Sequence, residues 1–146
     1  MSGLLAIEPQ LAERIGQRVA VPALKVLTAA ALSGVTENAQ PTPAVHVVYD
    51  GFSVREEKGL VEIVERWITV VAVRNVRSPR GGEDARQDAG PILDAVFAAL
   101  LGYQPAGVKP LLPANPPRPY FNAGFAYFPL AWSARLKKIP MPCPES

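Results

Sequence analysis

The side chains that could do acid–base or nucleophilic chemistry are few and lie far apart in the chain. His46 is the only histidine and Cys143 the only cysteine among the 146 residues. A histidine acts as a general base only when a nucleophile lies within hydrogen-bonding reach, and no serine or cysteine stands in a recognisable setting near His46. Cys143 lies in a proline-flanked tail. We therefore interpret both residues as structural, and an enzyme built on His46 and nearby carboxylates remains only an alternative.

Two adjacent pairs of acidic residues, Glu56–Glu57 and Glu83–Asp84, are predicted to lie in loops. Metal binding requires ligands that converge from several elements, and a single cysteine excludes a multi-cysteine zinc site. The glycines of residues 80–90, RGGEDARQDAG, match neither the Walker spacing nor the dinucleotide-binding fingerprint. The sequence therefore predicts no enzymatic activity, no metal site and no cofactor.

Three arginines, Arg74, Arg77 and Arg80, recur every three residues and could contact phosphate groups. The formal net charge of +2, however, is too small to indicate a nucleic-acid partner. We interpret the three arginines as a solvated strand end and loop. A small nucleic-acid-binding protein stays open as an alternative, and no specific nucleic acid is expected as a partner.

The composition is that of a globular protein: 49% of the residues are hydrophobic and 19% are charged. The length favours a single domain over residues 1–146. No apolar run approaches the roughly 18 residues of a membrane span, so no membrane partner is expected. The first ten residues, MSGLLAIEPQ, lack the features of a signal peptide. Together with the single cysteine, these features predict assembly in a reducing cytoplasm.

The longest structural signal is residues 61–76, VEIVERWITVVAVRNV, which are rich in β-branched and aromatic residues and predict a strand. A strand of that length bends, bulges or projects beyond its domain. Both of its faces are apolar in the middle, whereas a sheet covered on one face alternates more cleanly. We therefore expect helices to cover one face and a partner subunit to cover the other.

Around this strand the pattern predicts two helices and several further strands. Residues 8–20 repeat apolar side chains at helical spacing, and a second apolar stripe runs from Pro91 to Gly102, where Pro91 is either the first helical residue or a kink in a longer helix. Residues 44–49 predict a strand followed by a turn at Asp50–Gly51. Residues 55–59 then form a charged tip.

The C-terminal third is rich in proline: six of the 16 prolines lie between residues 105 and 119. Because proline cannot occupy a central strand, this stretch predicts an ordered connector. Residues 120–121 and 125–139 flank a predicted hairpin loop, Pro129 favours an edge strand, and residues 140–146 should be loose. The fold class that fits is α+β, with a mostly antiparallel sheet of four to five strands and two helices packed on one face.

The succession PALKVLTAAAL, PAVHVVYDG, WITVVAVRNV and GPILDAVFAALLGYQP, over residues 21–105, resembles the tail terminator proteins of Mu-like tailed phages and prophages. Those minor tail proteins are similar to the lambda-type tail terminator. The proline-rich PPRPY segment departs from that pattern. The resemblance implies a structural protein of the virion tail, assembled in the bacterial cytoplasm, with no activity and no cofactor.

The resemblance further implies a homo-hexameric ring that caps the tail tube, stops its polymerisation and offers a surface for head joining. The partners would be other copies of the chain, the major tail tube protein and a head-completion or connector protein. Another neck or tail completion protein of the virion is the main alternative. Charged residues in loops and at strand ends are the candidates for the contacts between subunits or with the tube: Arg55, Glu56, Glu57, Arg66, Arg74, Arg77, Arg80, Glu83 and Asp84.

Overall fold

The computed structural model describes residues 4–28, 41–74, 83–122, 124–136 and 139–140. These residues form two helices and a sheet with the strand order β1-β2-β3-β6-β4, to which β5 adds at β6 and β7 at β3. Strands β1 and β2 are parallel, and every other recorded pair is antiparallel. The predicted α+β class and mostly antiparallel sheet are confirmed; the additional strands are short.

The centre of the sheet is a long hairpin made of β2 (Ala44–Glu57) and β3 (Leu60–Arg74). It turns at Lys58 and Gly59, whose φ angles of 55° and 76° are those of a tight two-residue hairpin turn. The predicted turn at Asp50–Gly51 is wrong. Those two residues form a β-bulge, because Tyr49 pairs with Trp67 while Phe52 pairs with Glu65, which leaves two residues of β2 opposite one of β3.

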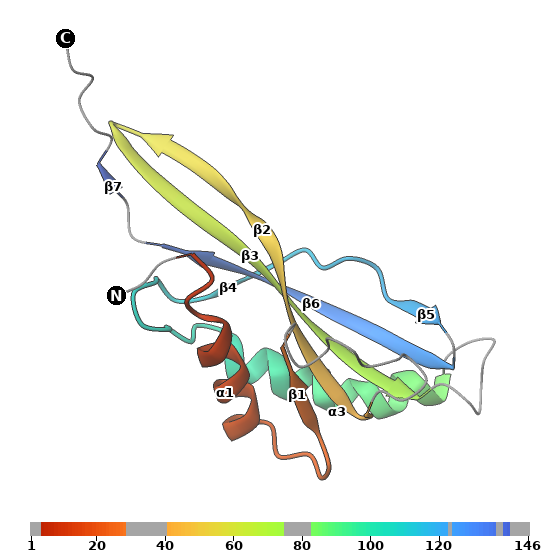
Figure 1. The fold of residues 1–146 in the computed structure, drawn as a ribbon. Helices are drawn as coiled ribbons and strands as arrows, with labels where there is room; N and C mark the ends of the chain where they lie inside the picture. The colour runs from red at the N-terminus through yellow and green to blue at the C-terminus, as the bar shows by residue number, and fades with distance from the viewer. Residues whose placement is uncertain (1–3, 29–40, 75–82, 123, 137–138, 141–146) are drawn as a thin grey trace.

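The two helices are α1 (Glu8–Arg18) and α3 (Glu83–Leu100). Pro91 lies inside α3, so of the two alternatives for this proline the one that places it within a longer helix is observed. Gly102, with φ 72°, follows the end of α3. Both helices lie on the same side of the sheet (Figure 1). They bury Leu11, Ile15 and Val96, among others, against the core.

The remaining strands are β1 (Lys25–Leu27), β4 (Leu112–Ala114), β5 (Tyr120–Asn122), β6 (Phe125–Arg135) and β7 (Ile139–Pro140). The predicted C-terminal hairpin is formed by β5 and β6, with Asn122 paired to Phe125. β4 and β5 both pair with β6, at residues 131–133 and 125–127. Pro129 lies between these two stretches, so neither β4 nor β5 requires the backbone N–H that proline lacks.

The two faces of the sheet differ in what covers them. The face toward the helices holds the main core, which includes Trp67, Val71 and Trp132, all fully buried. On the opposite face Ile68 and Val70 are only 5% and 7% exposed within the single chain. The prediction that a partner subunit must cover the middle of β3 is therefore wrong. Cover on this face includes Tyr120, which stacks on Tyr127 with ring centroids 4.6 Å apart.

Candidate assembly surfaces

Five of the nine charged residues predicted from the sequence lie at three places along the hairpin. Arg55, Glu56 and Glu57 end β2 beside the turn, at the far end of the molecule from α3 (Figure 1). Arg66 lies in the middle of β3 and Arg74 at its other end. Of the other four, Glu83 and Asp84 begin α3, and Arg77 and Arg80 lie outside the described residues. The seven residues that the structure describes therefore do not form one site.

Arg66 forms interactions with both the bulge of β2 and the proline-rich connector of residues 105–119. Its Nε lies 2.9 Å from Asp50 Oδ2, and its Nη2 donates a hydrogen bond of 2.7 Å to the Asn115 carbonyl oxygen. Asp50 is half exposed, so the ion pair is screened by solvent and contributes little to stability. Arg66 is thus already engaged within its own chain, which makes it a poor candidate for a contact with another protein.

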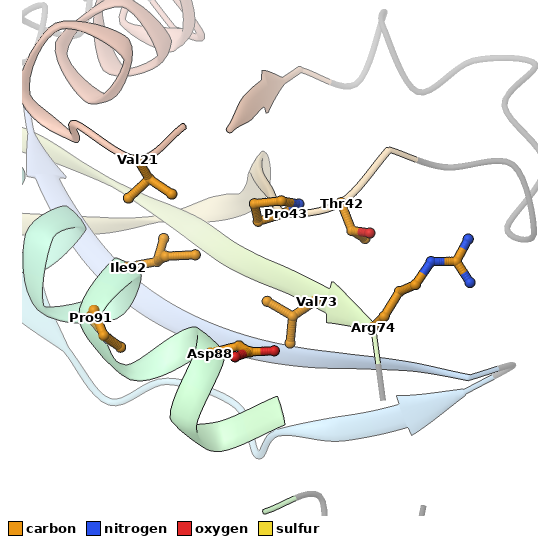
Figure 2. Close-up of a pocket in the computed structure, with 8 residues that line it drawn as sticks. All are labelled: Val21, Thr42, Pro43, Val73, Arg74, Asp88, Pro91 and Ile92. Carbon is orange, nitrogen blue, oxygen red and sulfur yellow. The ribbon is translucent and has the colours of Figure 1, made fainter. Parts of the chain in front are cut away.

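Arg74 lies at the rim of a hollow of about 350 Å³ between α3, the end of β3 and the start of β2. Figure 2 shows the Arg74 side chain extending away from the apolar residues of the lining, and its guanidinium carbon lies 5.1 Å from the centroid of the Phe125 ring. Most of the described lining is apolar, and Thr42 and Asp88 supply the other polar groups: Val21, Thr42, Pro43, Val73, Arg74, Asp88, Pro91 and Ile92.

Few side chains in the described lining of this hollow could take part in catalysis. Its polar groups are the Thr42 hydroxyl, the Asp88 carboxylate and the Arg74 guanidinium, and the described lining contains no histidine, cysteine or serine. Because a catalytic assignment requires a nucleophile positioned by a base, we interpret the hollow as a contact surface. Within the described ranges no group of three or more His, Cys, Asp or Glu side chains is placed to hold a metal ion.

His46 lies on β2, on the face away from the helices. Burial lowers the pKa of its imidazole below the usual 6.5, because the charged form would lose its hydration. Its Nε2 atom is buried without a hydrogen-bond partner, and its ring lies 6.4 Å from that of Tyr127. The burial of the imidazole and its unpartnered Nε2 fit a structural histidine.

A first exposed apolar surface, which the sequence reasoning missed, lies on the part of the hairpin that extends past the helices. We call this part the arm: residues 52–57 of β2 and 60–63 of β3. Phe52 is 50% and Val54 58% exposed. Both lie on the helix-side face, since they pair with Glu65 and Ile63, which alternate with Trp67. With Leu4 and Leu5, which are about half exposed, they form the arm patch.

One buried carboxylate connects the N-terminal residues of the arm patch to the hairpin. The Leu5 amide donates a hydrogen bond of 2.9 Å to Glu65 Oε2, and Glu65 is fully buried beside Phe52 in the strand register. This bond places the N-terminal leucines against the root of the arm. In the sequence Phe52 and Val54 look like core residues of an alternating strand; only the position where the helices end shows that they are uncovered.

A second exposed apolar surface lies on the other side of β3 in the strand order, beside β6. Phe97, Leu101 and Phe121 are 38%, 50% and 48% exposed. The Phe97 ring lies 5.4 Å from that of Trp132, and the Phe121 ring packs edge-on against Phe128 at 6.2 Å. Trp132 and Phe128 belong to the helix-side core, so Phe97 and Phe121 share the face of the arm patch, and Leu101 follows α3 one turn after Phe97. We call them the edge patch.

Comparison with known families agrees with an assembly protein. Neither described helix is long and apolar enough to cross a bilayer. No curated protein matches the chain. The family model described as "Phage tail terminator protein" matches residues 1–139, which is nearly the whole sequence. The charged strand ends and exposed apolar patches therefore belong to a structural component of the virion tail, and the chain is a member of the phage tail terminator family.

Proposed function

We propose that this protein forms a homo-hexameric ring that caps the tail tube. The ring stops polymerisation of the tube and offers the surface to which the head-completion or connector protein joins. The observation that carries this proposal is the family match over residues 1–139, because a tail terminator acts on other components of the tail and head. The protein would be assembled onto the tail in the bacterial cytoplasm and remain in the virion.

The length of the β2–β3 hairpin is consistent with a protein that contacts different partners at the two ends of the hairpin. A strand of 15 residues such as β3 spans about 50 Å. One end of the hairpin carries Arg55, Glu56 and Lys58, and the other carries Arg74 beside the start of α3. A cap must match the last ring of the tube on one side and differ from a tube subunit on the other. Two unlike, well-separated charged ends satisfy that requirement.

A complementation experiment tests the proposal. A phage lacking this gene should produce tubes of unregulated length that do not join heads. Supplying the protein from a plasmid should restore tails of one length, measured by electron microscopy, and restore infectious particles. Tubes of normal length in the strain that lacks the gene would overturn the capping role. Tubes of normal length that still fail to join heads would instead support the alternative of a neck completion protein.

A further inference from the structure

The arm patch and the edge patch consist of different residues and lie on opposite sides of β3 in the strand order. Phe52 and Val54 of the arm patch are on β2, whereas Phe97 and Phe121 of the edge patch are on α3 and β5 and pack against β6. A two-fold dimer needs one self-complementary surface, whereas a closed ring needs two different surfaces that meet head to tail. We propose that the arm patch of one copy binds the edge patch of the next copy and so closes the ring. This inference rests on the proposed function.

The chemistry of the two patches favours a second copy of this chain over the tube or head protein as the occupant. Permanent interfaces between identical subunits are more apolar than transient ones and resemble a core cut in two. Phe52, Val54, Phe97, Leu101 and Phe121 are all apolar and all at least about two-fifths exposed. Large apolar patches on the surface of a soluble protein commonly mark interaction sites.

The charged groups are placed where contacts with other proteins would be made. Arg55, Glu56 and Lys58 lie at the tip, beyond Val54, and each is exposed. Glu56 follows Val54 on the helix-side face, whereas Arg55 pairs with Glu62 and lies on the opposite face. Arg55 and the turn residue Lys58 would therefore remain accessible when the helix-side face of the arm is covered. The arm therefore has two separable surfaces: an apolar face for the neighbouring copy and a charged tip for the tail or head component.

The edge patch has the features of an anchor site. Phe97 and Phe121 are each held by a ring contact with the core, to Trp132 and Phe128. Side chains that are already fixed lose little conformational entropy when a partner covers them. Aromatic residues in such positions carry most of the binding energy in many interfaces. Phe52 of the neighbouring copy is the matching aromatic residue on the arm.

Val48 offers a matched control for Val54. Both are exposed valines of β2, at 38% and 58%, but Val48 pairs with Ile68 and so lies on the face away from the helices. Val54→Asp should weaken association between copies by about tenfold or more, whereas Val48→Asp should leave it near the wild-type value. Sedimentation over a range of protein concentrations measures the association between copies, and the fraction of tails that carry a cap measures its effect on assembly.

Cysteine cross-linking tests which surfaces meet. In a Cys143→Ser background, copies carrying Val54→Cys are mixed with copies carrying Phe97→Cys, and tails capped by the mixture are oxidised. The expected product is a covalent pair of unlike copies, and the double variant should give a ladder ending in a closed ring. Val48→Cys with Phe97→Cys should give none. Leu101→Cys replaces Phe97→Cys if the latter variant does not fold.

The outcomes separate this inference from the function on which it rests. If the Cys143→Ser protein caps tails but no product joins position 54 to position 97 or 101, the interface is wrong and the capping role stands. A product between two Val54→Cys copies would mean a two-fold contact and overturn the head-to-tail arrangement. A product between Val54→Cys and the tube protein would make the arm patch a tube-binding surface instead. If the wild-type protein fails to cap, the proposed function itself is wrong.

Discussion

Asp50 and Arg66 face each other across the hairpin at the one place where its register shifts, with Arg66 Nε 2.9 Å from Asp50 Oδ2. Two residues of β2, Asp50 and Gly51, stand opposite Arg66 alone. A bulge of this kind bends its strand and increases the local twist. The bulge therefore sets the direction of the arm that begins at Phe52, and that direction depends on the conformation of Gly51.

The first prediction concerns Gly51, whose φ of 85° is unfavourable for any residue with a Cβ atom. A Cβ built there meets nothing within 4 Å, so the cost of Gly51→Ala is backbone strain alone. We expect the free energy of unfolding to fall by about 1–2 kcal/mol in chemical denaturation. Gly16→Ala is the control, because its Cβ also meets nothing within 4 Å but it lies in α1, where the change should stabilise by about 0.5–1 kcal/mol. Equal effects at the two sites would contradict the assignment of the bulge.

The same bulge shows where reasoning from the sequence reached its limit for the fold. Asp50–Gly51 and Lys58–Gly59 are both plausible turns, and the chain between them alternates as a strand does. The local pattern predicts a turn at the first pair, yet the pairing of Phe52 with Glu65 and of Val54 with Ile63 continues the hairpin to the second. The choice depends on pairing with β3, a long-range interaction that turn propensity does not contain.

The assembly surfaces were predictable only in part, for a related reason. The charges of residues 55–59 identify an exposed tip from the sequence alone, and the structure places them there. The apolar patches could not be found in this way, because Val54 and Phe97 carry the same sequence signal as buried residues of their strand and helix. The exposure of Val54 follows from how far the hairpin extends past the helices, and that of Phe97 from how α3 is oriented on the sheet, and both are properties of the packing.

The second prediction concerns Trp67, which is fully buried at the centre of the core and lies 5.1 Å from the ring of Tyr49. Trp67→Ala should lower the free energy of unfolding by about 3–5 kcal/mol, because it leaves a large cavity. Trp67→Phe should cost much less, since the indole Nε1 of Trp67 is buried without a hydrogen-bond partner.

Trp132 provides the matched comparison, because it is equally buried but its Nε1 donates a hydrogen bond of 3.1 Å to Thr69 Oγ1. Trp132→Phe leaves that hydroxyl without its donor, so it should cost about 1 kcal/mol more than Trp67→Phe. Urea denaturation of the two phenylalanine variants measures the difference. Identical losses would show that the Thr69 contact does not contribute to stability.

The third prediction follows from the lowered pKa of His46. The folded protein takes up a proton on His46 only at a lower pH than the unfolded chain, whose histidine has a pKa near 6.5. Stability is therefore full above that value and falls as the pH drops through 6.5 toward the lower pKa of the folded state. Denaturation at pH 7.5, 6.5 and 5.5 should show this loss, and His46→Gln should remove it. A slope that persists in His46→Gln would assign it to other groups.

The last prediction concerns the charged tip, where Arg55 is exposed beside the Lys58–Gly59 turn. Arg55 lies opposite Glu62 in the strand register, so Arg55→Glu sets two carboxylates side by side and should lower the melting temperature by a few degrees. Capping is therefore compared well below the melting temperature of either variant. If the tip binds the tail tube or the head component, reversing the charge sets like charges against each other and should lower capping by about tenfold. Lys25→Glu is the control, because it makes the same charge change at an exposed position on β1, away from the tip. Salt screens contacts between exposed charges, so the difference between the two variants should shrink as ionic strength rises. Equal capping by both variants at low salt would exclude the tip from the contact and leave the end near Arg74 as the charged surface to test.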